Sequence, residues 1–186
     1  MGVSDRITAW SNTPFDRQAF EDSLTDSTLI DIHAHVFGEG SVGRDPVTAE
    51  LMVEWMDDHG IDQTVLLPTE SPEASSLAPT WWVFEQAERY PDRFLPFCGV
   101  DPRHLEYGRE NLERRIQAYV DRGARGFGEH KMGLPIDDDR CEVVYEVCAE
   151  HDLPVLLHLD EKSCMDEPGL PGFEAMLASY PGVDFI

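Results

Sequence analysis

Apolar residues along this chain follow two alternating periods. Short runs that are apolar throughout, or at every second residue, predict β-strands, and apolar residues three or four apart predict amphipathic helices. The expected strands cover residues 29–37, 63–70, 93–102, 125–133, 153–160 and 183–186. The expected helices cover residues 48–59, 79–90, 105–122, 138–151 and 171–180. Strands that alternate with helices in this way predict βαβ units and a parallel sheet, which is an α/β fold.

The first of these helices shows how the pattern works. The apolar residues expected on its buried face are Leu51, Met52, Trp55 and Met56. Gly60 follows them directly, and a glycine in this place is a common helix stop because it adopts the left-handed conformation without strain. The sequence therefore predicts a helix that packs one face on the sheet and ends before residue 60.

A sheet of this kind can close in two ways, as an open doubly wound sheet or as a (β/α)8 barrel of typically about 250 residues. No GxGxxG fingerprint follows the first expected strand, which disfavours a dinucleotide-binding sheet. The 186 residues supply five complete βα units and the start of a sixth strand. We therefore expect a TIM-like barrel, with an N-terminal arm over residues 1–28 and the N-terminal part of the barrel over residues 29–186, cut before its last strands.

The first expected strand, LIDIHAHVF, has one apolar and one polar face, because side chains alternate across a strand. The side chains that share the polar face are Asp31, His33 and His35. The opposite face, which includes Ile32, is expected to pack on the surrounding helices. Two imidazoles at i and i+2 aim at one point, where a divalent cation can bind both, and Asp31 is placed to orient one of them. The alternative is that both histidines hydrogen-bond to neighbours or water.

Further polar side chains are expected where later strands end, which is the end of a barrel that carries active sites. His158 and Asp160 share a face at the end of the fifth strand, and Glu129 and Lys131 share a face at the end of the fourth. Histidines and carboxylates that come from separate strands favour a metal site over isolated hydrogen-bonded histidines. Arg103 follows the third strand on the same rim and is a candidate for binding substrate.

The net charge of the chain limits the classes of partner that it can bind. Asp and Glu number 37 against 14 Lys and Arg, so the formal net charge is −23. Such a surface repels nucleic acid and anionic lipid, and no apolar run approaches the roughly 20 residues of a membrane span. Dispersed acidity with very few lysines is typical of halophilic proteins, because molar salt screens the repulsion. The N-terminus shows no secretory signal, so we expect a cytoplasmic protein that acts on a small molecule and is free to form a homo-oligomer.

Three motifs carry a family resemblance. With DIHAH on the first strand, GARGFGEHKMG on the fourth and LPVLLHLD on the fifth, the chain resembles the amidohydrolase superfamily, and within it the amidohydrolase-2 branch of TIM-like metal-dependent hydrolases and decarboxylases. The resemblance runs from about residue 28 to the last residue. The metal ligands that it implies are His33, His35 and His158, with Glu129, and after it Lys131, as an additional ligand from the fourth strand.

The same resemblance implies two further groups, a histidine on the sixth strand and an aspartate on the eighth. Both would fall beyond Ile186, so the catalytic acid and base cannot be assigned within this sequence. Lys131 is one of only two lysines in a chain that avoids them, and it is a candidate for pairing with Glu129 or with an anionic substrate.

The resemblance implies a metal-dependent hydrolase that acts through a metal-bound water on a small organic substrate. A metal-dependent non-oxidative decarboxylase of a small carboxylic acid needs the same ligands and stays open. A reading of another class is a non-catalytic metal-binding half-barrel that pairs with a partner chain. Zn²⁺ suits the mixed histidine and carboxylate donors, and Mn²⁺ or Fe²⁺ fits them nearly as well.

Overall fold

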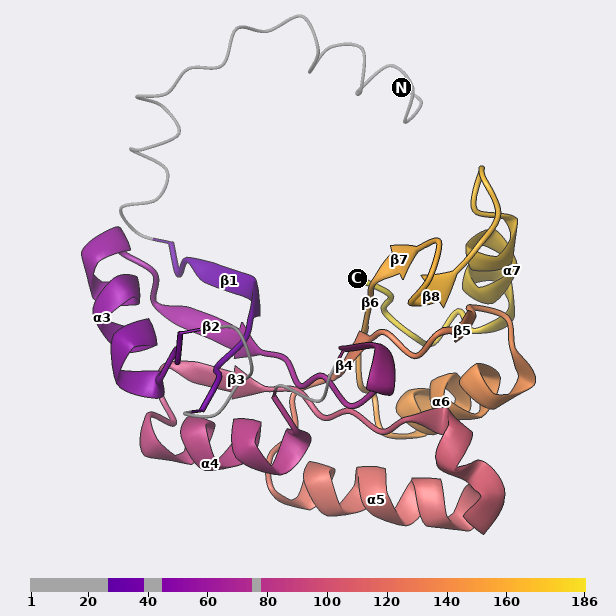
Figure 1. Ribbon diagram of the computed structural model, residues 1–186, viewed down its shortest axis with the longest axis horizontal. Helices are drawn as coiled ribbons and strands as arrows, with labels where there is room; N and C mark the ends of the chain where they lie inside the picture. The colour runs from indigo at the N-terminus through magenta and orange to yellow at the C-terminus, as the bar shows by residue number, and fades with distance from the viewer. Residues whose placement is uncertain (1–26, 39–44, 75–77) are drawn as a thin grey trace, which may run out of the picture.

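The computed structural model describes residues 27–38, 45–74 and 78–186 (Figure 1). The expected arm over residues 1–28 lies almost wholly outside them and stays a prediction. The strands are β1 (Ile30–Ala34), β2 (Gln63–Leu66), β3 (Phe94–Pro96), β4 (Phe127–His130), β5 (Leu134–Pro135), β6 (Val155–Leu157), β7 (Leu159–Asp160) and β8 (Cys164–Met165). The helices are α3 (Ala49–His59), α4 (Thr80–Arg89), α5 (Arg109–Asp121), α6 (Asp139–Glu150) and α7 (Pro171–Ser179), with short 3-10 helices η1 (Pro72–Ala74) and η2 (Pro102–Tyr107).

The strands follow one another in parallel. Strands β1, β2 and β3 pair in that order, and β4 pairs with β6. A parallel bridge from Cys98 to Phe127 connects the third strand segment to β4, and a parallel bridge from Val155 to Phe185 adds the expected sixth strand. Helices α3 to α6 lie on the outer side of this arc (Figure 1). This order confirms that the chain has the fold of part of a TIM-like (β/α)8 barrel.

The buried core around β2 has two layers, because side chains alternate between the two faces of the strand. On β2, Leu66 belongs to a buried cluster shared with residues of α3 and α4, such as Met56 and Val83. The next residue, Leu67, faces the other way and packs with Phe97 and other interior residues. The layers therefore arise from a period of two along each strand. None of the helices in the described residues is long and apolar enough to cross a membrane.

The capping of α3 explains where this helix begins and ends. The side chain of Thr48 accepts a hydrogen bond from Leu51 N at 3.4 Å, and Gly60 adopts the left-handed conformation with φ of 68°. The glycine stop that the sequence predicts is present. The helix that was expected over residues 105–122 begins later, at Arg109, because η2 occupies the preceding residues.

The apolar face of β1 is less covered than expected. Ile30 and Ile32 are 41% and 51% exposed, and on α3 the side chains of Leu51 and Trp55 are 50% and 47% exposed. An open hollow of about 430 Å³ separates this part of α3 from β1. The expected packing of Ile32 on helices is therefore wrong, because within the described residues β1 is an edge strand that pairs with β2 alone.

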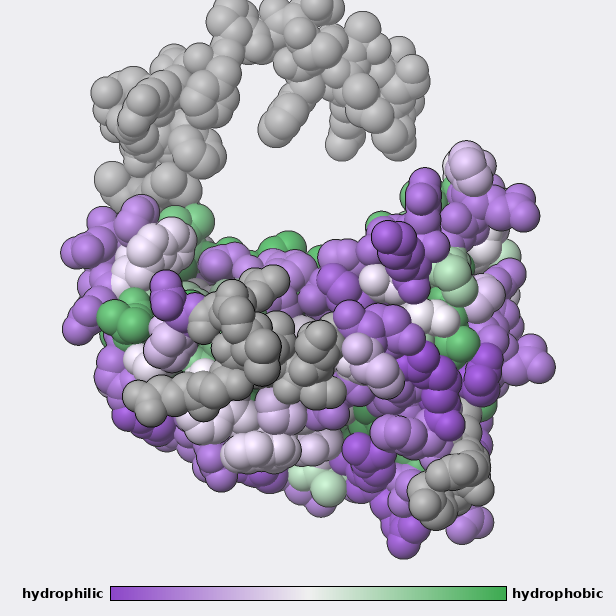
Figure 2. All heavy atoms as spheres, viewed as in Figure 1, coloured by the Kyte–Doolittle hydropathy of each residue, from purple (hydrophilic) through white to green (hydrophobic). Residues whose placement is uncertain are grey.

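A second, smaller sheet was not expected. Its three short strands lie in the order β5–β8–β7, and β8 runs parallel to both neighbours. It is built from segments of two residues that follow β4 and β6, so it stands at the carboxyl ends of the barrel strands (Figure 1). Elsewhere on the face shown in Figure 2 hydrophilic residues predominate, in line with the acidic composition.

Candidate metal centre

Strand β1 brings two imidazoles together. The Nε2 atoms of His33 and His35 lie 3.3 Å apart. The Nδ1 atom of His35 lies 2.9 Å from the main-chain oxygen of Leu67, which follows the neighbouring strand β2. A carbonyl only accepts hydrogen bonds, so His35 donates from Nδ1. In the neutral ring this leaves the lone pair on Nε2, directed at His33 and the interior.

Strand β4 adds a carboxylate from across the interior. Glu129 is 3% exposed, and its Oε2 atom lies 3.3 Å from His35 Nε2 and 3.9 Å from His33 Nε2. The ligand atoms of these three residues all lie within 4.8 Å of one another. Two imidazole nitrogens and one carboxylate oxygen are a donor set that suits Zn²⁺ and similar divalent cations.

The charges of the site keep the carboxylate ionised and the histidine neutral. Burial alone would raise the pKa of Glu129, but contact with His35 and the charge of Lys131 lower this pKa to about 2. Burial lowers the pKa of His33, although Glu129 acts in the opposite direction. A cation requires both groups in their deprotonated forms, so near neutral pH the two residues are prepared to bind one.

His158 joins the cluster through Glu129. It follows β6, and its main-chain nitrogen donates to the oxygen of His130 at 3.1 Å, which ties it to β4. Its Nδ1 atom is in contact with Glu129 Oε1. The Nζ atom of Lys131 lies 3.2 and 3.4 Å from the two ring nitrogens of His158 and 3.8 Å from Glu129 Oε1. One contiguous polar group is therefore formed by five residues: His33, His35, Glu129, Lys131 and His158.

A model of the amidohydrolase family, of the amidohydrolase-2 type, matches residues 30–186. The chain belongs to this family. No curated protein sequence matches the amidohydrolase chain. The family model covers all of the strands and helices named above, and it confirms the resemblance that the three sequence motifs indicate.

Solved structures share the fold of this amidohydrolase. An uncharacterized TIM-barrel protein from Bordetella bronchiseptica is 19% identical, with a TM-score of 0.63 over 86% of this chain and 66% of its own. A 5-carboxyvanillate decarboxylase from Novosphingobium aromaticivorans with bound manganese is 17% identical, with a TM-score of 0.56 over 86% and 65%. A probable 2-pyrone-4,6-dicarboxylic acid hydrolase from Acinetobacter baumannii with citric acid bound is 17% identical, with a TM-score of 0.51 over 71% and 49%. The amidohydrolase chain thus spans about half to two-thirds of the length of these proteins.

The remaining predicted site residues lie around the cluster in different roles. Asp31 accepts a hydrogen bond from the main-chain nitrogen of His33 at 3.0 Å, so among the described residues it contacts the backbone of the motif and not a ring. Asp160 Oδ2 lies 3.2 Å from Nε2 of His158. Backbone hydrogen bonds from Lys162 and Ser163 lower the pKa of Asp160 to about 2, so it is an anion at neutral pH.

Arg103 is held by two carboxylates. Its guanidinium bonds to both oxygens of Asp101, which is 3% exposed, and to both oxygens of Glu73 at 2.7 Å. These bonds raise the pKa of Arg103 and lower that of Glu73 to about 2. In the amidohydrolase chain Arg103 therefore ties the loop after β2 to the loop after β3, and its role in binding substrate stays a prediction.

One feature of the site has no signal in the sequence. The carbonyl of Leu67 that orients His35 belongs to the main chain, which carries no side-chain signal. His130 points away from Glu129, as alternation along β4 predicts, and it is fully buried beside the rings of Phe127 and Tyr145. Among the described residues neither of its ring nitrogens has a hydrogen-bond partner. Burial lowers the pKa of His130 to about 4, so it is a neutral packing residue.

Proposed function

We propose that this amidohydrolase chain is part of a metal-dependent hydrolase of small organic substrates. The proposal rests on the distances between the candidate donor atoms. Two donor atoms bound at about 2.0–2.1 Å to one tetrahedral Zn²⁺ are about 3.4 Å apart. In the chain, His35 Nε2 lies 3.3 Å from both His33 Nε2 and Glu129 Oε2. These separations match the distance between two ligands of one cation.

Four side chains are proposed to hold the ion, and one main-chain carbonyl to orient one of them. His33, His35 and Glu129 would hold it, with His158 as the fourth ligand, and Zn²⁺ suits this set best. A cation bound there lowers the pKa of a coordinated water toward about 7 and polarises a substrate carbonyl. Leu67 contributes by accepting the Nδ1 proton of His35, which fixes the ring with Nε2 directed inward.

Lys131 supports a second candidate function. Its side chain is 25% exposed, and its ammonium group stands beside the proposed ligands His158 and Glu129. A cation in this place suits a substrate carboxylate, which a non-oxidative decarboxylase of a small carboxylic acid would present. We keep this decarboxylase as the alternative, because it would use the same metal ligands. The non-catalytic half-barrel remains the candidate if no reaction is found.

The acidic surface supports a salt-rich cytoplasmic setting without nucleic acid or membrane partners. With a formal net charge of −23, repulsion between surface carboxylates opposes folding in dilute buffer. The midpoint of thermal unfolding should therefore rise when KCl is raised from the millimolar to the molar range. An unchanged or lower midpoint would contradict the halophilic interpretation.

The proposed metal site is tested by elemental analysis of the full chain purified in high salt. We expect about one equivalent of bound metal in the unaltered protein and none in a His33→Ala/His35→Ala variant. The matched control is His59→Ala/His151→Ala, which removes two histidines at the ends of α3 and α6 and should keep the metal. Absence of metal in the unaltered protein, even after reconstitution with Zn²⁺ and Mn²⁺, would overturn the proposal.

The two reactions are then separated by their products. Protein that binds metal is incubated with small esters, amides and lactones and with aromatic and aliphatic carboxylic acids. Release of acid from the first group supports the hydrolase, and release of CO₂ from the second supports the decarboxylase. Lys131→Met should weaken the turnover of carboxylic acids more than that of neutral substrates if the ammonium group binds a carboxylate.

A further inference from the structure

His158 is the one proposed ligand whose two ring nitrogens both face a carboxylate. Nδ1 contacts Glu129 Oε1, and Nε2 lies 3.2 Å from Asp160 Oδ2. A neutral imidazole has one nitrogen that donates and one that accepts. Only one of the two carboxylates can therefore receive the ring proton, and the nitrogen that faces the other is left with a lone pair.

The carboxylates of Glu129 and Asp160 differ in the other groups that they contact. Glu129 is buried and shares its oxygens with His33, His35 and Lys131. Asp160 lies outside that group, and its position is fixed by its own turn. Its Oδ1 accepts from the main-chain nitrogens of Lys162 and Ser163, at 2.7 and 2.5 Å, and its Oδ2 accepts from the Ser163 hydroxyl at 3.1 Å.

The turn that holds Asp160 is anchored by the small sheet of β5, β8 and β7. Ser163 is 5% exposed, and its main-chain oxygen accepts hydrogen bonds from Gly133 and Leu134, next to and within β5. The pairing of β8 with both β5 and β7 holds the residues on either side of this turn. The three-stranded sheet therefore holds the Asp160 carboxylate in place beside His158.

We infer that Asp160 is a positioning residue that accepts the Nε2 proton of His158 and so leaves Nδ1 as the nitrogen available to a cation beside Glu129. The inference rests on the proposed function in that it takes His158 as a metal ligand. Lys131 does not decide the tautomer, because its ammonium group lies at 3.2 and 3.4 Å from the two ring nitrogens. The small sheet thereby has a role, which is to hold the acceptor that orients this ring.

The test reads the ring directly. Full-length protein labelled with ¹⁵N in its histidines is compared by NMR with a His158→Gln variant, which assigns the His158 nitrogens. At a pH high enough for the ring to be neutral, we expect a protonated Nε2 in the metal-free protein, and a proton that moves to Nδ1 or exchanges between both nitrogens in Asp160→Asn. The control Asp166→Asn alters a carboxylate of the same loop that accepts main-chain N–H groups of Gly172 and Phe173, and it should leave the ring unchanged.

Titration with Zn²⁺ supplies the second readout. We expect Asp160→Asn to bind Zn²⁺ about 10- to 100-fold more weakly than the unaltered protein, and Asp166→Asn to bind it equally well. A ring protonated only on Nδ1 in the unaltered protein, or an identical ring in Asp160→Asn, would overturn the inference. If the unaltered protein binds no metal, the proposed function fails while the NMR comparison still decides the role of Asp160. The spectrum of the unaltered protein also decides it should Asp160→Asn not fold.

Discussion

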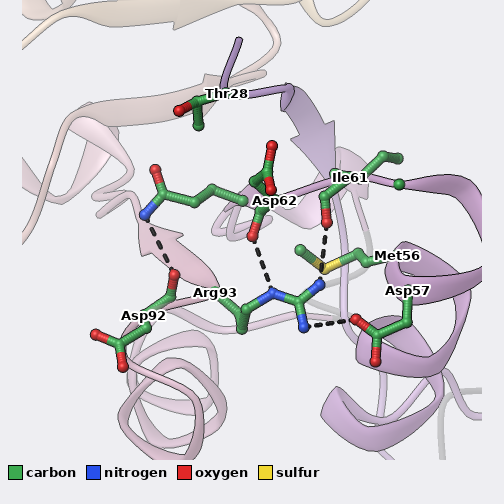
Figure 3. A pocket seen from close by; sticks show the side chains of 9 residues that line it. Thr28, Met56, Asp57, Ile61, Asp62, Asp92 and Arg93 are labelled. Atoms are coloured by element: carbon green, nitrogen blue, oxygen red, sulfur yellow. Dashed lines mark hydrogen bonds and ion pairs between the residues drawn. The ribbon is translucent and has the colours of Figure 1, made fainter. Parts of the chain in front are cut away.

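At the amino ends of the strands the guanidinium group of Arg93 has an acceptor for each of its nitrogens, whereas at the carboxyl ends imidazole and carboxylate groups are crowded together. Arg93, just before β3, donates to Asp57 Oδ1 at 2.7 Å and to the main-chain oxygens of Asp62 and Ile61 at 2.9 and 3.0 Å (Figure 3). The Asp62 carboxylate accepts from Leu29 N at 2.8 Å. A polar hollow of about 690 Å³ is lined by Arg93, Asp57, Ile61 and Asp62 among others, and each of the guanidinium nitrogens has an acceptor.

The carboxyl ends show the opposite arrangement. There His33 and His35 set two nitrogens 3.3 Å apart, with the carboxylate of Glu129 at a similar distance. We infer from this difference that polar residues at the amino ends of the strands stabilise the fold and that those at the carboxyl ends serve the proposed metal site, as barrels generally divide these tasks.

The largest expected effect follows from removing the carboxylate at the crowded end. Glu129→Gln keeps the size of the side chain but replaces an anionic donor with a neutral amide. We expect the variant to bind no Zn²⁺ at micromolar concentration, measured by isothermal titration calorimetry. Its metal-free thermal stability should fall as well, because Lys131 and His158 lose the buried carboxylate that they contact.

The control for this experiment is Glu73→Gln, which removes a carboxylate that serves Arg103 in a loop. It should lower stability slightly and leave Zn²⁺ binding intact. If Glu129→Gln retained the affinity of the unaltered protein, the carboxyl end would not differ from the amino end in the way described.

A somewhat smaller effect concerns pH and His130, the neighbour of Glu129 on β4. A histidine titrates near 6.5 in an unfolded chain, whereas burial lowers the pKa of His130 to about 4. Between these values the unfolded chain takes up a proton that the folded protein does not, so stability is lost as the pH falls from 6.5 to about 4. The loss is roughly 3 kcal/mol.

His130→Phe should remove this loss, so that its advantage over the unaltered protein in urea unfolding grows as the pH falls. The exposed His104 provides the control, because His104→Phe should leave the pH dependence as it is. Parallel pH profiles for the unaltered protein and His130→Phe would refute the burial of an uncharged ring beside Tyr145.

The smallest effect is expected at the amino ends of the strands. Arg93→Met removes three hydrogen bonds of a charged group that is 26% exposed, and should lower the free energy of unfolding by about 2 kcal/mol. Affinity for Zn²⁺ should stay unchanged, because the pocket lies at the opposite end of the strands. Arg122→Met is the comparison, since Arg122 pairs with Glu88 on the surface and should contribute less than about 1 kcal/mol. Loss of metal binding in Arg93→Met would show that the two ends are coupled.

Much of the architecture could be predicted because it depends on local periods. Alternation along β1 places His33 and His35 on one face, and alternation along β4 separates Glu129 from His130. Helical spacing located α4 and α6 to within a residue or two of their ends. These features need only the neighbours of each residue in the sequence, and a single chain supplies them.

What could not be predicted depends on contacts between distant segments. Strands β5, β7 and β8 have two residues each, too few to show a period. The pairing of Arg103 with Glu73 joins loops 30 residues apart, and the exposure of Trp55 depends on what covers β1. Such contacts arise only when the chain is folded, so the sequence pattern gives no direct sign of them.

The division of the proposed ligands between β1 and β4 has a mechanical consequence. These strands belong to separate paired groups, β1–β2–β3 and β4–β6, and β1 is held on one side only within the described residues. An ion bound by His35 and Glu129 would cross-link the two groups through the interior. Ion binding would then be coupled to the local opening of β1. A bound ion would lengthen the time for which the amide protons of β1 are protected from exchange with water.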